Sequence, residues 1–176
     1  MKKTVILFLL LASLLSVSDT LASDVTLYTG YQNPGELSFG NLDQDAQSGG
    51  VVGARFGGGG ILGFEQTLGY SWRFLASGQR AFNSQSNVVV AVPAGRVVPY
   101  GTAGIGFITT FGDFRGLEDI ADIGTKFTIN YGGGVKFKNL AGPLGFRVDV
   151  RGYSVPDVFN QTLNFVEASI GLLFSW

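Results

Sequence analysis

The residues of this chain that could do chemistry are its charged ones, because the most versatile catalytic side chains are missing. The 176 residues include no histidine and no cysteine. This excludes thiol nucleophiles, metal sites built from Cys or His, Ser-His-Asp triads and acid–base catalysis by imidazole. What remains is a set of charged residues in segments of alternating polarity, which could form ion pairs: Arg55, Glu65, Lys126, Lys136, Arg147, Asp149, Arg151 and Glu167.

Two other segments have the composition of ligand sites but not the spacing. Residues 113–122 contain four acids, which could hold a divalent cation, but they do not follow the EF-hand pattern. The four glycines at 57–60 lack the Lys-Ser/Thr ending of a phosphate-binding loop. We therefore expect a solvated loop and a flexible turn, and we predict neither a metal nor a cofactor.

The composition excludes several protein classes. Charged residues make up 14% of the chain, against roughly 25% in ordinary globular domains, and its 27 glycines are about twice the usual share. An aromatic content of 13% and a formal net charge of −1 argue against a disordered tail. The same balance provides no basic stripe, so we predict no nucleic-acid partner.

The first 22 residues are predicted to be a secretory signal peptide. Lys2 and Lys3 precede an apolar run at 5–15, and small residues at Thr20 and Ala22 suit cleavage after Ala22. A helix of that run would span about 17 Å, well short of a bilayer core of about 30 Å, so a membrane anchor is disfavoured. The mature domain is then predicted at residues 23–176.

The elements that must position the charged residues are predicted to be β-strands. Few segments keep a period of 3.6 residues, whereas segments with a period of two recur between Gly, Asn, Asp and Pro. We predict eight strands, at residues 24–31, 48–57, 61–72, 84–93, 97–109, 125–137, 143–153 and 161–176.

The predicted connections alternate in length. Those at 32–47, 73–83 and 110–124 are long, that at 154–160 is intermediate, and the others are short. This alternation places the long loops at one end of a barrel and both termini at the other, as in outer-membrane barrels.

The polarity of the two strand faces decides between two kinds of barrel. At 144–151 large apolar residues alternate with Gly145, Arg147, Asp149 and Arg151. A soluble barrel that holds a ligand would turn the apolar face inward, but its outer surface would then carry too few charges. An eight-stranded lumen is also too narrow for large side chains from every strand. We therefore predict an all-β fold, an eight-stranded antiparallel up-and-down transmembrane β-barrel with the apolar face toward lipid.

Aromatic residues near the strand ends are predicted to form the two girdles that membrane barrels carry at their interfaces. The members are Tyr28, Tyr31, Tyr70, Trp72, Tyr100, Phe137, Tyr153, Phe174 and Trp176.

The inward-facing charges are expected to pair with each other, because a buried charge without a partner is costly. From strand adjacency, Arg147 or Arg151 should reach Glu167, and Arg55 should reach Glu65. Two outcomes remain open: a plug of mutually satisfied ion pairs, which we favour, or a gate whose pairs rearrange to pass small ions.

Three segments resemble a known family. Ile170, Leu172, Phe174 and Trp176 form an alternating C-terminal strand that resembles the assembly signal of bacterial outer-membrane barrels. The hairpin at 87–106 and the glycine-rich strand at 131–137 resemble the OmpA/OprF-like transmembrane barrel domain. The resemblance implies an outer-membrane location, contact with the lipid bilayer and lipopolysaccharide, and folding by the barrel assembly machinery. Larger members that this resemblance points to also carry a periplasmic peptidoglycan-binding domain. This sequence shows no such domain, so we do not expect the protein to be tethered to the cell wall.

The functional prediction follows from this resemblance and from the missing histidine. Small outer-membrane barrels that are enzymes rely on an active-site histidine, so we predict a non-enzymatic protein, and we expect it to be a monomer. We expect a structural role in the envelope, with at most a narrow, charge-plugged lumen. The alternative is a ligand-binding or adhesion protein that works through its long surface loops.

Overall fold

The computed structural model describes residues 23–34, 38–39, 42–43, 48–74, 79–111, 124–158 and 161–176. No helix among these residues is long and apolar enough to cross a membrane. The predicted signal peptide and the acidic segment 113–122 lie outside the described residues, and both stay predictions. The strands are β1 (Ser23–Pro34), β2 (Ser38–Phe39), β3 (Leu42–Asp43), β4 (Gly49–Gly59), β5 (Leu62–Trp72), β6 (Arg80–Ala91), β7 (Val97–Phe111), β8 (Thr125–Ala141), β9 (Leu144–Val158) and β10 (Gln161–Ser175).

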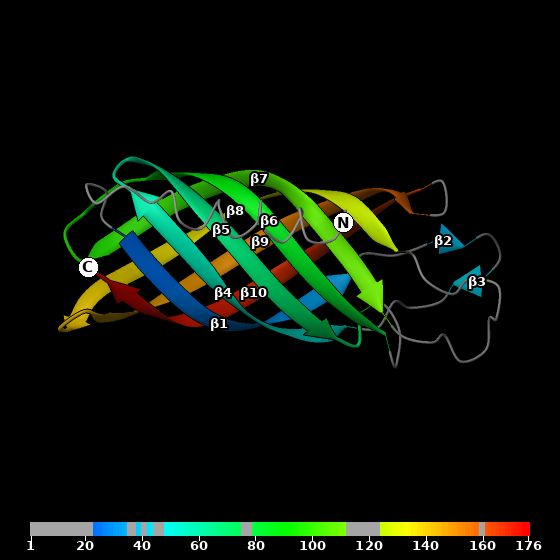
Figure 1. Cartoon of the computed structure of the whole chain (residues 1–176), viewed down its shortest axis with the longest axis horizontal. Coiled ribbons are helices and arrows are strands. Elements are labelled where there is room, and N and C mark those ends of the chain that lie inside the picture. Colours follow the sequence, from blue (N-terminus) through cyan, green and yellow to red (C-terminus); the bar gives the residue numbers. More distant parts are fainter. Residues whose placement is uncertain are drawn as a thin grey trace, which may run out of the picture.

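Eight of these strands close into one antiparallel barrel, in the order β1-β10-β9-β8-β7-β6-β5-β4. β1 closes the ring, because it pairs with both β10 and β4. Figure 1 shows the strands running obliquely around one long axis, with the β2–β3 pair beyond one end of the barrel. The prediction of an all-β, eight-stranded, up-and-down barrel is confirmed.

The strands reach further toward the long loops than the sequence pattern predicts. β6 begins at Arg80 rather than at residue 84, and residues 80–83 pair with β5 on one side and β7 on the other. β9 runs to Val158, so only residues 159–160 separate it from β10. The predicted boundaries were therefore wrong here, because the pairing of backbone groups continues past the point where polar residues such as Asn83 blur the pattern.

The two ends of the barrel differ in their connections. We call the end with the β4–β5, β6–β7 and β8–β9 connections the turn end, and the other the long-loop end. At the turn end Gly59 and Gly142 have φ angles of 121° and 61°. Residues with a Cβ rarely adopt these angles, so glycine permits these tight reversals.

The side chains alternate between the two faces of the barrel wall. Large apolar side chains such as Leu27, Phe107 and Leu172 point outward and are 55%, 55% and 61% exposed. Arg55 and Glu65 point inward and are fully buried. The predicted orientation is therefore the observed one, and a soluble barrel with an apolar interior is excluded.

Three residues predicted for the aromatic girdles lie inside the barrel instead. Tyr28, Tyr100 and Tyr153 are buried, whereas Tyr31 and Trp72 are exposed as predicted. The strand-end criterion failed because it ignored the alternation of faces: Tyr28 and Tyr100 share the inward register of buried Thr26 and Thr102.

The charged interior of the barrel

Six of the predicted charged residues meet at mid-height in the barrel, in what we call the central charged layer. It contains three arginines and three carboxylates, and no side chain in it is more than 1% exposed. They come from β4, β5, β9 and β10, and the six formal charges balance: Arg55, Glu65, Arg147, Asp149, Arg151 and Glu167.

The ion pairs of this layer differ from the predicted ones. Arg55 donates to Asp149 at 3.0 Å and to Glu167 at 2.9 Å. Glu65 accepts from Arg147 at 2.5 Å and from Arg151 at 2.6 Å. The prediction that Arg55 pairs with Glu65, and Arg147 or Arg151 with Glu167, was therefore wrong. Long arginine side chains reach across a narrow lumen, so adjacency in the sheet does not select the partner.

Neutral side chains add further hydrogen bonds to the charged layer. Asp149 accepts from the hydroxyl of Tyr100, which in turn accepts from Arg147 Nε at 2.8 Å. Glu167 accepts from Gln32 at 2.9 Å. The guanidinium carbon of Arg55 lies 3.7 Å from the ring centre of Tyr28, which is within cation–π range. Sequence reasoning missed both tyrosines as interior residues, although their register with neighbouring polar residues carried the signal.

The remaining two predicted charges on β8 lie away from the central layer. Lys136 lies near the turn end, where its Nζ donates to Asp24 Oδ2 at 2.7 Å, and Lys138 approaches the same oxygen at 3.3 Å. Lys126 lies near the long-loop end and is half-buried. The sequence did not single out Asp24 or Lys138, because each stands next to a strand end.

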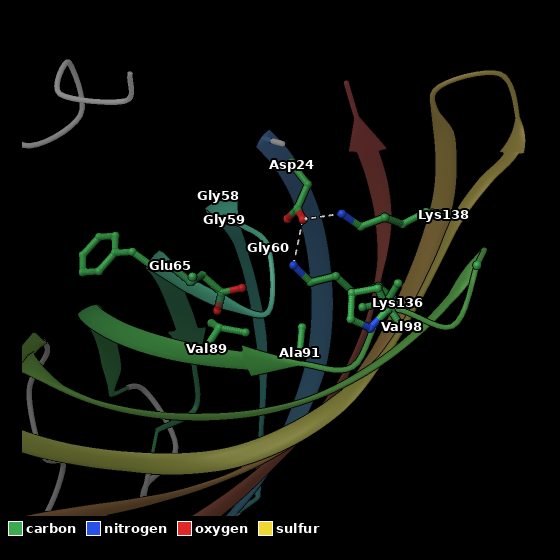
Figure 2. Close-up of a pocket in the computed structure, with 14 residues that line it drawn as sticks. Asp24, Gly58, Gly59, Gly60, Glu65, Val89, Ala91, Val98, Lys136 and Lys138 are labelled. Atoms are coloured by element: carbon green, nitrogen blue, oxygen red, sulfur yellow. Dashed lines mark hydrogen bonds and ion pairs between the residues drawn. The ribbon is translucent and has the colours of Figure 1, made fainter. Parts of the chain in front are cut away.

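A pocket of about 220 Å³ opens beneath these residues at the turn end. Figure 2 shows Asp24, Lys136 and Lys138 on one side of it, and Glu65 on another. Val89 and Ala91 form an apolar wall. Because Glu65 also belongs to the central charged layer, the pocket extends inward as far as that layer.

The long-loop end of the lumen is filled by what we call the apolar layer. Tyr153 stacks on Phe165 with ring centres 4.7 Å apart, and Phe74 meets the edge of Phe165 at 5.4 Å. All members are at most 4% exposed: Phe74, Ala81, Ile108, Tyr153, Val155, Leu163 and Phe165.

The C-terminal residues of the predicted assembly signal all face outward on β10. Ile170, Leu172 and Phe174 alternate with buried or half-buried residues, and Trp176 follows at the end. This exposes one apolar row beside β1. Its recognition by the assembly machinery stays a prediction.

The interior carboxylates of the central layer are held in ion pairs. The described residues contain no group of three or more His, Cys, Asp or Glu side chains that could hold a metal ion. The central carboxylates accept hydrogen bonds from arginines and are closed off from solvent. The ion pairs therefore fill the lumen at this level and hold the side chains that form it in place.

The comparisons with known proteins agree with this architecture. A family model for the outer membrane protein beta-barrel domain matches residues 4–173. No curated protein matches the chain by sequence. Neisserial surface protein A superposes with a TM-score of 0.68 and 15% identity, over 88% of this chain and 97% of that protein.

Two further solved structures share the fold. The N-terminal β-barrel domain of Pseudomonas aeruginosa OprF has a TM-score of 0.56 and 11% identity, over 87% of this chain and 97% of that one. The outer membrane enzyme PagL has a TM-score of 0.52 and 18% identity, over 86% and 98%. At these identities the likeness concerns the fold alone.

The family match covers nearly the whole chain, and the fold has the closed strand ring and apolar outer face that a lipid bilayer requires. The resemblance to small outer-membrane barrels is thereby confirmed, and the protein is placed in the outer membrane. This chain belongs to the outer membrane protein β-barrel domain family.

Proposed function

We propose that the protein is a non-enzymatic, structural barrel of the outer membrane whose lumen does not conduct ions. The observation that carries the proposal is the closure of the lumen at two successive levels. The central charged layer is electrically balanced and buried from solvent, and the apolar layer lies above it toward the long loops.

The central layer supports a plug rather than a gate. Each arginine contacts at least two acceptors; Arg147, for example, binds Glu65, Asp149 and the Tyr100 hydroxyl. Moving one side chain would therefore leave several buried polar atoms without partners, which is costly in a water-excluded interior. The turn-end pocket is then open toward the turn end and closed by the central charged layer at its inner end.

The absence of catalysis is supported by the side chains that the chain offers. It contains no histidine and no cysteine. The carboxylates of the central layer engage arginines, and Asp24 engages Lys136 and Lys138, so each is held in an ion pair rather than free to act as a general base. PagL shows that an enzyme can share this fold, so the argument depends on the residues and not on the architecture.

Single-channel recording in planar bilayers tests the proposal. We expect no current steps from the wild-type protein, because both layers block the path. Glu167→Ala should also stay silent, since Arg55 keeps Asp149 and Ser169 as partners. Phe165→Ala should stay silent because the charged layer remains.

The double variant Glu167→Ala/Phe165→Ala serves as the positive control, because it opens a polar gap at one level and a cavity at the next. Discrete openings in the wild-type protein would overturn the proposal. The alternative of a ligand-binding surface concerns the long loops, which lie largely outside the described residues, and it stays a prediction. Shortening the loop at 112–123 and measuring surface adhesion would test it.

A further inference from the structure

A polar island interrupts the apolar outer surface of the barrel on β5 and β6. It consists of Gln66, Ser84 and Ser86. Gln66 Nε2 donates to Ser84 Oγ at 3.0 Å, and Ser86 Oγ donates to Gln66 Oε1 at 2.7 Å. The three side chains face outward, because they alternate with Glu65, Thr67 and Gln85, which are fully buried inside.

The polar island lies at mid-depth in the membrane. Gln66 is four residues along β5 from Leu62 at the turn end. With a rise of about 3.3 Å per residue and a strand tilt of about 40°, it stands about 10 Å into an apolar band about 25 Å tall. Its outward-facing surroundings are apolar and are exposed or, at Leu68, half-buried: Phe64, Leu68, Phe82, Val88, Ile105 and Phe107.

The internal hydrogen bonds leave part of the island's bonding capacity unused. A glutamine amide has two N–H donors and a carbonyl oxygen with two lone pairs. Within the described part of the chain, Gln66 uses one N–H and accepts one bond, and the Ser84 hydroxyl accepts without donating. Hydrocarbon tails offer neither donors nor acceptors, so the remaining groups need a protein partner.

We propose that the polar island is the contact through which two copies of this protein associate in the membrane. The partner must present donors and acceptors at the same depth in the bilayer. A second copy does so by construction, because both copies insert in the same orientation. Under two-fold symmetry about the membrane normal, the island meets itself, and the free Gln66 N–H of each copy can donate to a Gln66 or serine oxygen of the other.

The proposed association revises the expectation of a monomer drawn from the sequence. It is independent of the proposed lumen function, because the island and the charged layers occupy opposite faces of the wall. Conduction measurements and association measurements can therefore fail separately.

Cysteine cross-linking tests the proposal directly, because the chain has no cysteine of its own. The variant Ser86→Cys is reconstituted in phospholipid vesicles at low protein density and treated with a mild oxidant. The matched control is Ala168→Cys, which is exposed midway along β10 on the opposite side of the ring. We expect severalfold more disulfide-linked dimer from Ser86→Cys than from Ala168→Cys.

A second substitution separates specific association from chance encounters. Gln66→Leu in the Ser86→Cys background should lower cross-linking to the level of Ala168→Cys. Val150→Leu in the same background lies on the outer surface at the opposite side of the ring, and it should leave cross-linking unchanged. Circular dichroism checks that each variant is folded. Equal cross-linking at positions 86 and 168, no cross-linking at either, or undiminished cross-linking in folded Gln66→Leu would overturn the proposal, and a heteromeric or lipid partner would then have to be sought.

Discussion

At the scale of single residues, the interior charges are held by shared partners rather than by isolated pairs. Arg147 and Arg151 both bind Glu65, and Asp149 accepts from Arg55, Arg147 and Arg151. Removing Arg147 leaves three buried carboxylates and two buried arginines, so one negative charge in the central charged layer is no longer balanced. The contact of Lys138 with Asp24 differs, because the Lys138 side chain is 21% exposed and Lys136 remains to balance the charge of Asp24.

This difference predicts the effect of two truncations on stability. Arg147→Ala should lower the free energy of unfolding by about 3–5 kcal/mol, since it leaves an unbalanced negative charge in the buried layer. Lys138→Ala should lower it by less than about 1 kcal/mol, because solvent screens that partly exposed contact. Urea unfolding in lipid vesicles measures both, and equal losses would contradict the shared-partner interpretation.

At the scale of elements, the glycines of β8 leave room for atoms of the neighbouring strands that lie against the inner face of β8. A Cβ atom at Gly134 would lie 2.1 Å from the carbonyl oxygen of Val148 and 2.7 Å from the Tyr100 hydroxyl. A Cβ atom at Gly132 would lie 2.8 Å from the Cα of Arg151. This geometry indicates that the glycines leave room for neighbouring backbone and for the interior side chains in a narrow lumen.

A matched pair of alanine substitutions tests the role of the β8 glycines. Gly134→Ala should destabilise the barrel by about 1–3 kcal/mol, because backbone and the Tyr100 hydroxyl must move apart. Gly101→Ala on neighbouring β7 should be almost neutral, because a Cβ there would approach nothing closer than 3.9 Å. Urea unfolding again provides the comparison. An unchanged free energy of unfolding in Gly134→Ala would show that the barrel wall accommodates the added Cβ atom without strain.

At the scale of the whole molecule, the distribution of apolar and charged side chains is the reverse of that in a soluble protein. Its largest exposed side chains are apolar, and its fully buried ones include Arg55, Arg147 and Arg151. Such a surface is stable only in hydrocarbon, whereas the charges are stable only when they meet inside. The lipid therefore takes the place that the apolar core occupies in a soluble domain.

The orientation predicts a depth-dependent penalty for a new outward charge. Val150→Arg, midway along β9, should reduce the free energy of folding into vesicles by about 2–4 kcal/mol. Thr162→Arg, next to the long-loop end of β10, should change it by no more than about 1 kcal/mol. Folding into vesicles followed by urea titration measures the pair. A tolerated Val150→Arg would be incompatible with lipid at that face.

Much of this architecture follows from the alternation of residues, because a strand must send neighbouring side chains to opposite faces. The pattern at 144–151 was enough to place Arg147, Asp149 and Arg151 inside, and the scarcity of surface charge was enough to choose lipid as the outer medium. The strand ends were harder to predict, because backbone pairing at Arg80 and Val158 depends on neighbouring strands and not on local polarity.

The sequence by itself determined the fold class and the identities of the residues that face inward. Only the tertiary structure decided which of them meet. Arg55 reaches Asp149 and Glu167, and Glu65 receives two arginines, because closure of the ring brings the inner faces of non-adjacent strands within a side chain's length. The stagger of the strands sets that closure, and it is a property of the whole ring that no single strand encodes.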